Sequence, residues 1–231
     1  MTSPLRLGVR GLSRLLIAAG LLGLGYVAWS LFEMSFVQSR ERRAFERRTA
    51  VPAPGSRLPD TLPGDPAPVG SATAPARPAS GATIGLLRIP RIGLDVVVKE
   101  GVDDATLKVA AGHVPETPLP GAVGADGNVA LAAHRDTLFR PLRHVRVGDR
   151  VRLETEAGVF DYDVDATAIV EPRDVHVLAP RGFPALTLVT CWPFDFRGSA
   201  PQRFVVHARQ VGAERRPGSY TPHVPEPKEA P

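Results

Sequence analysis

The stretch Leu186-Thr187-Leu188-Val189-Thr190-Cys191-Trp192-Pro193-Phe194 carries the only cysteine of the protein. Its β-branched and aliphatic residues are typical of a buried strand. Pro193 has no N–H to donate to a sheet, so the strand is predicted to end at or near Cys191. The thiol is therefore expected at the rim of a sheet, on a rigid element that can hold a nucleophile in place.

Two other stretches carry the groups that a reactive thiol needs, because a thiol attacks as thiolate and requires a base or a positive neighbour. Residues 127–136 form a short apolar run that leads into His134. Residues 202–209 alternate, which places Arg203 and His207 on one face of a predicted strand and apolar side chains on the other. Taken singly, each group has a structural alternative, since a lone cysteine often serves as a small core residue.

In these stretches the sequence resembles the sortase family of cysteine transpeptidases, most closely its class D. The matching blocks are residues 134–142, 186–191 and 198–204. They occur in the family's order within a region of about residues 83 to 211. One departure is Ala133, where the family is expected to have glycine before the histidine.

The resemblance implies a role for each residue of the site. Cys191 would be the nucleophile, and His134 would protonate the leaving amine and deprotonate the incoming one. Arg203 would stabilise the oxyanion or hold the substrate. Thr190 and Trp192 are the expected substrate contacts, although Trp192 fits a core position equally well. No cofactor and no metal ion are expected.

The resemblance also implies the reaction partners. The substrates would be proteins with a C-terminal LPXTG-like sorting signal, and the acceptor an amine on a peptidoglycan precursor or a pilin. Two alternatives remain: a hydrolytic cysteine protease of the same fold, and a non-catalytic envelope-binding β domain. The second alternative predicts loss of His134, Cys191 or Arg203, and all three are present.

Other polar residues near these blocks are weaker candidates. His113 is flanked by glycine and is a secondary candidate for the site. His207 lies about 13 Å along its strand from Arg203, given a rise of about 3.3 Å per residue. Asp136 follows His134 by two residues and is expected to cap a turn.

Composition changes along the chain divide its 231 residues into six segments. The eighteen residues from Leu15 to Phe32 carry no charge and would span about 27 Å as a helix, close to the thickness of a bilayer core. A cleavable signal peptide is the main alternative for this segment. The predicted segments are a short basic N-terminus (1–14), a transmembrane anchor (15–32), a charged juxtamembrane stalk (33–48), a proline-rich disordered linker that acts as a spacer (49–81), a catalytic domain (82–212) and a disordered tail (213–231).

The predicted catalytic domain has the pattern of an all-β fold, with short apolar runs separated by Gly, Pro and Asp. The resemblance implies the eight-stranded sortase barrel with short helices, and residues 103–108 are predicted as one helical turn with an acidic N-terminus. The predicted strands are residues 83–89, 94–99, 127–133, 150–155, 158–170, 185–191 and 202–211.

The distribution of charge bears on partners and orientation. Residues 1–50 hold eight arginines and three glutamates, whereas residues 82–212 hold fifteen basic and sixteen acidic side chains, so no basic domain surface supports nucleic-acid binding. Arginines follow the apolar segment more often than they precede it, which by itself favours a cytoplasmic domain. A single-pass cell-membrane protein with an extracytoplasmic catalytic domain is expected from the resemblance alone. Residues 33–48 would then contact anionic headgroups or form a solvated helix.

Overall fold

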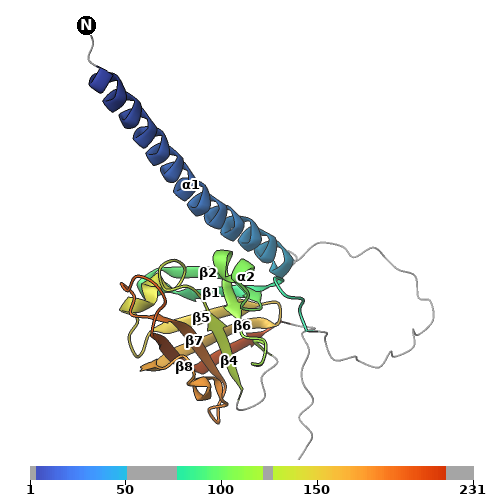
Figure 1. The fold of residues 1–231 in the computed structure, drawn as a ribbon. Coiled ribbons are helices and arrows are strands. Elements are labelled where there is room, and N and C mark those ends of the chain that lie inside the picture. Colours follow the sequence, from blue (N-terminus) through green and yellow to red (C-terminus); the bar gives the residue numbers. More distant parts are fainter. Residues whose placement is uncertain (1–3, 51–76, 122–126, 217–231) are drawn as a thin grey trace, which may run out of the picture.

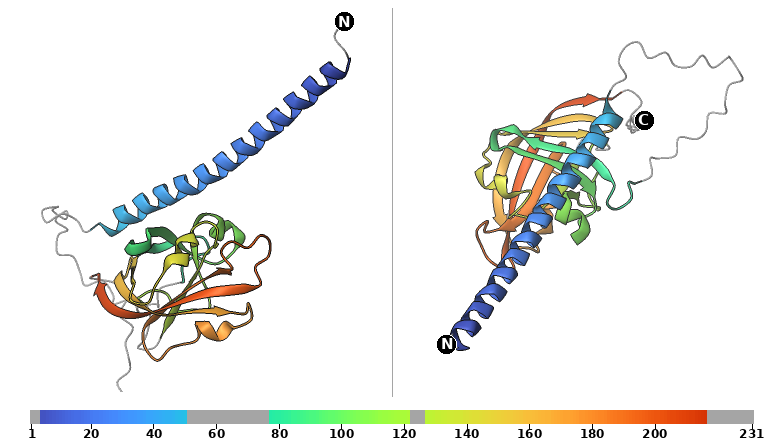
Figure 2. Two further views of the ribbon diagram at one scale, coloured as in Figure 1. Left: turned by 90° about the vertical axis from the view of Figure 1, so that its left-hand side faces the viewer. Right: turned by 90° about the horizontal axis from the view of Figure 1, so that it is seen from above.

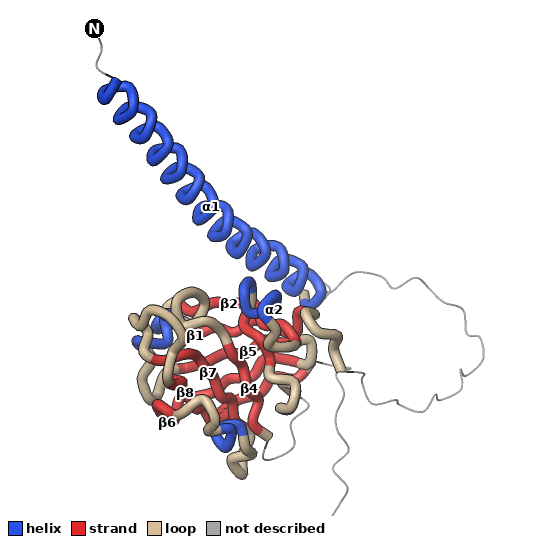
Figure 3. Tube along the Cα trace, in the orientation of Figure 1, coloured by secondary structure: helices blue, strands red, loops and turns tan. Residues whose placement is uncertain are grey.

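The computed structural model describes residues 4–50, 77–121 and 127–216. In these residues, eight strands close into one barrel in the order β1-β2-β3-β4-β7-β8-β6-β5, which confirms the predicted eight-stranded barrel (Figure 1). The strands are β1 (Thr83–Ile89), β2 (Leu94–Glu100), β3 (Ala111–His113), β4 (Asn128–Ala132), β5 (Arg150–Thr155), β6 (Gly158–Val170), β7 (Ala185–Trp192) and β8 (Gln202–Arg215). Helical elements lie around this body: α1 (Pro4–Thr49), α2 (Asp104–Val109) and the 3-10 turns η1 (Pro90–Ile92), η2 (Arg140–His144) and η3 (Val175–Leu178) (Figure 3).

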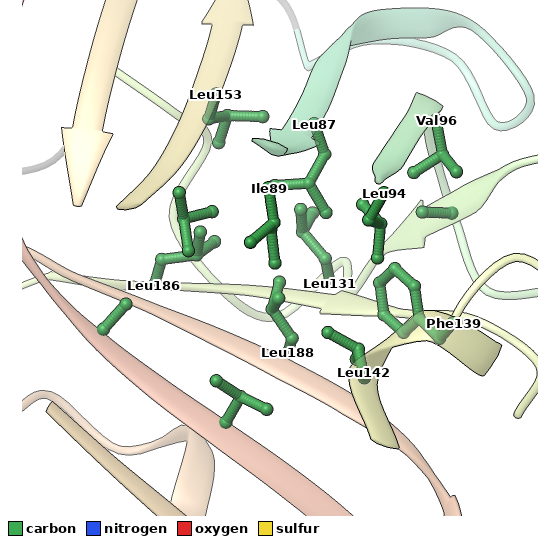
Figure 4. Packing of buried hydrophobic residues seen from close by; sticks show 14 of the residues in the cluster. Leu87, Ile89, Leu94, Val96, Leu131, Phe139, Leu142, Leu153, Leu186 and Leu188 are labelled. Atoms are coloured by element: carbon green, nitrogen blue, oxygen red, sulfur yellow. The ribbon is translucent and has the colours of Figure 1, made fainter. Parts of the chain in front are cut away.

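The barrel interior is filled by alternate apolar side chains of the strands. Leu186 and Leu188 of β7 point into the core beside Leu131 of β4 and Ile89 of β1 (Figure 4). Burying one such side chain contributes about 1.5–3 kcal/mol. Phe139, which follows the β4 strand, closes the core at one end. β7 was predicted from a continuous apolar run, and the structure shows which of its alternate residues face the core.

Two strand predictions need correction. β3 was not predicted, yet it pairs in parallel with β2 and antiparallel with β4. Gly112 permits this close packing, because a Cβ atom there would lie 2.2 Å from the carbonyl oxygen of Gly101. β8 continues to Arg215, so residues 213–215 belong to the barrel and not to the predicted tail. The rest of that tail (217–231) and most of the predicted linker (51–76) lie outside the described residues.

Helix α1 is continuous through the predicted anchor and the predicted stalk, and its C-terminal part lies over β1 and β2 (Figures 1 and 2). Phe45 is fully buried against Leu86 and Val97. The Val97 N–H donates to Gln38 Oε1 at 2.8 Å, and the Thr83 hydroxyl donates to the Glu41 carboxylate at 2.8 Å. Residues 33–48 are thus neither a free solvated helix nor a segment engaged with lipid alone.

The N-terminal part of α1 projects beyond the barrel (Figure 2). The large apolar side chains described between residues 15 and 32 are all exposed, from 54% at Val27 to 76% at Leu22. Among the described residues, no helix combines the length and the mean hydropathy expected of a membrane span. The transmembrane anchor stays a prediction.

Candidate functional site

Cys191 and Arg203 face each other across the antiparallel pair β7–β8, where their Cα atoms are direct partners. Residues directly opposite in such a pair share one face of the sheet, with Cβ atoms about 4.5–5.5 Å apart. Because Leu186 and Leu188 point inward, Cys191 lies on the outer face of the barrel. Cys191 is a free, half-buried cysteine, and the residue opposite it in the ladder is an arginine.

His134 reaches the same face through the parallel pair β4–β7. In this pair Ala132 is the partner of Val189, and the Ala133 N–H extends the ladder by donating to the Val189 carbonyl at 3.3 Å. His134 and Cys191 follow Ala132 and Val189 by two residues each, so the register continues to place them side by side. Cys191 and Arg203 lie on the adjacent strands β7 and β8, and the exposed His134 lies two residues beyond the end of β4, the strand that pairs with β7 on its other side.

The guanidinium of the half-buried Arg203 is held by backbone carbonyls. It donates to the carbonyls of Gln202 at 3.0 Å and Ala200 at 3.4 Å. In the described part of the chain it has no carboxylate within ion-pair distance. An arginine held by neutral carbonyls keeps its full charge available for an anion that develops nearby.

Thr190 is buried, in contrast to its predicted role as a substrate contact. Its hydroxyl donates to the carbonyl of Ala133 at 2.7 Å, and the Ala133 side chain is itself buried in the core. The bond ties the residue before His134 to the residue before Cys191. This geometry favours a role in positioning the histidine over direct contact with substrate.

Trp192 belongs to an aromatic cluster at the edge of the core. Its ring centroid lies 5.5 Å from that of Phe194 and 5.9 Å from that of Phe204, and the Trp192–Pro193 peptide bond is cis. The side chain remains partly exposed next to Cys191. A substrate contact by Trp192 stays a prediction.

The connection between β7 and β8, residues 193–201, is held by two arginines that sequence reasoning missed. Arg135 donates to the carbonyls of Phe196 at 2.8 Å and Gly198 at 3.0 Å. Arg143 pairs with Asp195 at 3.1 Å. Apart from the adjacency of Arg135 to His134, nothing in the sequence indicated these contacts.

His207, the weaker alternative to His134, belongs to a buried network further along the outer face. Its Nδ1 lies 3.0 Å from the hydroxyl of Thr187, and that hydroxyl donates to Asn128 Oδ1 at 2.8 Å. Asn128 in turn donates to the carbonyls of Val177 and Ala179, which fastens η3 to the sheet. Burial lowers the pKa of His207, and the nearby positive charge of an arginine lowers it further.

His113, the secondary candidate, is fully buried beside β2. Its Nδ1 lies 2.8 Å from the carboxylate of Glu100, and its Nε2 lies 3.0 Å from the carbonyl of Pro118. With both ring nitrogens engaged internally, the ring has a structural role. The described residues contain no group of three or more His, Cys, Asp or Glu side chains placed to hold a metal ion.

Comparisons with known proteins agree with this geometry. A family model described as Sortase domain matches residues 87–211. Sortase D of Bacillus subtilis (strain 168) is 30% identical over 197 residues, covering 85% of this chain and 96% of that protein. The solved structure of a Clostridium perfringens Sortase D5 transpeptidase is similar with a TM-score of 0.51 and 29% identity, covering 58% of this chain and 82% of that one. Sortase A from Corynebacterium diphtheriae, in a lid mutant, gives a TM-score of 0.54 and 29% identity, with 61% and 75% covered.

Proposed function

Because the chain belongs to the sortase family of cysteine transpeptidases, we propose that it cleaves an LPXTG-type sorting signal and transfers the carried protein to an amine on the cell envelope. One observation supports the assignment of the site: Cys191 and Arg203 are direct partners in one antiparallel pair, on the strand that also pairs with the strand leading to His134. The sequence reasoning had selected these three residues.

In the proposed reaction the Cys191 thiolate attacks the carbonyl carbon of the signal's threonine, and a C–S bond forms. Arg203 stabilises the oxyanion of the tetrahedral intermediate. The C–N bond to the following residue then breaks, and the His134 imidazolium gives its proton to the departing amine. The acceptor amine attacks the thioacyl carbonyl, His134 takes its proton, and the thiolate leaves.

We further propose that the protein is anchored in the cell membrane by α1, with the catalytic domain outside the cytoplasm. The exposed apolar side chains between residues 15 and 32 support the anchor, since such a surface is unfavourable in water. The orientation rests on the family reaction, whose sorting signals and acceptor amines belong to the cell envelope.

The test uses the full-length chain in detergent with a fluorogenic library of LPXTG-type peptides and several amines, followed by mass spectrometry. Ligated product that disappears in Cys191→Ala supports the proposal and identifies the preferred signal. Cleavage by the wild type without ligation to any amine favours the hydrolytic protease. A folded wild-type protein that leaves every peptide intact contradicts the proposed sorting signal.

A further inference from the structure

The side chain of Arg135, the residue after His134, bonds to the connection that joins Cys191 to Arg203. Arg135 Nη2 donates to the carbonyls of Phe196 and Gly198 at 2.8 and 3.0 Å. Its guanidinium carbon lies 5.9 Å from the centre of the Phe196 ring. Both carbonyls belong to residues 193–201, which leave β7 just after Cys191 and enter β8 just before Arg203.

We propose that Arg135 is a positioning residue that sets the place of His134 relative to Cys191. This rests on the proposed roles of those two residues. Arg135 is the next residue after His134, so a bond that fixes its side chain limits the backbone freedom of the histidine. The last hydrogen bond of the β4–β7 ladder is made by Ala133. After it, the bonds of Arg135 join the residues that follow His134 to the connection between β7 and β8.

The backbone of the connection is shaped to receive Arg135. Gly198 has a φ of +97°, a conformation that residues with a side chain rarely adopt. A Cβ atom at this position would meet no atom within 4 Å, so the requirement for glycine comes from the backbone conformation alone. In this conformation the Gly198 carbonyl accepts a hydrogen bond from Arg135 Nη2, which also donates to the Phe196 carbonyl.

Arg143 offers a comparison within the same connection. It pairs with Asp195, whose side chain is 82% exposed, and its guanidinium carbon lies 5.3 Å from the centre of the Phe194 ring. It therefore orders the connection without reaching back to the residue beside His134. If ordering of residues 193–201 were all that mattered, loss of either arginine would have the same effect.

The experiment measures the pH dependence of Cys191 alkylation by iodoacetamide, together with kcat and KM for ligation. The proteins are the full-length wild type, Arg135→Ala, Arg135→Lys, Arg143→Ala and Arg140→Ala, of which Arg140 is exposed on the same segment. We expect Arg135→Ala to lower kcat about 100-fold with little change in KM, as for a misplacement of about 1 Å. Its alkylation profile should shift, because the thiolate loses its imidazolium neighbour. Arg135→Lys should recover only part of kcat, because an ammonium lacks the planar donor geometry.

Each outcome decides the proposal. An alkylation profile for both Arg135 variants that matches the wild type overturns it, even if no peptide is ligated, because alkylation does not depend on the sorting signal. If Arg135→Ala and Arg143→Ala lower kcat equally, the proposal is also overturned, because both arginines would then act only by ordering residues 193–201. If Arg135→Ala fails to fold, as judged by circular dichroism, Arg135→Lys and Gly198→Ala replace it with the same expected shift. A shifted profile with an inactive wild type supports the positioning role while counting against the proposed substrate.

Discussion

Cys191 and Arg203 are direct partners in the β7–β8 ladder. Their proximity is therefore set by the register of two long strands and not by the conformation of a flexible loop. A slip of one residue would turn both side chains into the core. The buried residues Leu188 and Val206, which are also partners in this pair, hold the register in place.

Replacing Arg203 should remove oxyanion stabilisation while leaving the thiol in place. We expect Arg203→Ala to lower kcat about 10²–10³-fold, the usual loss for one such donor. Arg203→Lys should recover part of the lost kcat, because lysine keeps the positive charge but lacks the planar array of guanidinium N–H donors. Steady-state ligation kinetics measure both, with Arg209→Ala on the same strand as control. If the kcat of Arg203→Ala stayed within about threefold of the wild-type value, another group would have to stabilise the oxyanion.

Thr190→Val tests whether this residue positions His134 or contacts substrate. The variant keeps the shape but leaves the Ala133 carbonyl without its hydroxyl donor, at a cost of about 1–3 kcal/mol in the free energy of unfolding. Urea unfolding measures this, and Thr190→Ser should stay close to wild type. An unchanged stability with a raised KM would instead support the substrate contact predicted from sequence.

Phe45→Ala should release α1 from the barrel. Truncation of a buried phenylalanine costs about 3–5 kcal/mol, and here the loss falls on the contact with Leu86 and Val97. Hydrogen exchange should accelerate in residues 38–49 while the barrel core stays protected. Phe36, which is 55% exposed, provides the control as Phe36→Ala. Equal exchange in the two variants would mean that the buried ring does not hold the helix.

His207 should make the barrel less stable in mild acid. Burial lowers the pKa of His207 below its ordinary value of 6.5, so the unfolded chain binds this proton more readily than the folded one. Its contribution to stability is complete above about pH 6.5 and is lost as pH falls toward the lowered pKa. In urea unfolding from pH 7.5 to 5, the difference in stability between wild type and His207→Gln should change across this window. A constant difference would show that His207 does not titrate differently on folding.

Much of the barrel could be predicted because its signals are local. β7 reads as an aliphatic run that stops at a proline, and β6 alternates Phe160, Tyr162 and Val164 with aspartates. The three candidate site residues were selected from blocks that resemble the sortase family, and each lies in or close to the end or start of a strand. These patterns need no knowledge of distant residues.

The features that sequence missed depend on contacts between distant residues. β3 has three residues with glycine at its centre and exists only through pairing with its neighbours. Arg135 meets Phe196, which is 61 residues away, through a backbone carbonyl that any residue type could supply. Phe45 packs on Leu86 and Val97, which lie on the faces of β1 and β2 that point away from the barrel core. Their apolar side chains alone did not indicate in the sequence that a helix covers them.

The docked end of α1 also determines where the helix lies relative to the start of the barrel. Ala44, Arg47 and Arg48 border the same pocket as Gly81 and Thr83, so the helix ends beside the place where the barrel begins. The placement of the barrel against the docked part of α1 therefore depends on these contacts, and not on the number of residues between the end of the helix and the start of β1. A change in the length of the proline-rich sequence would leave the contacts of Phe45 with Leu86 and Val97 in place.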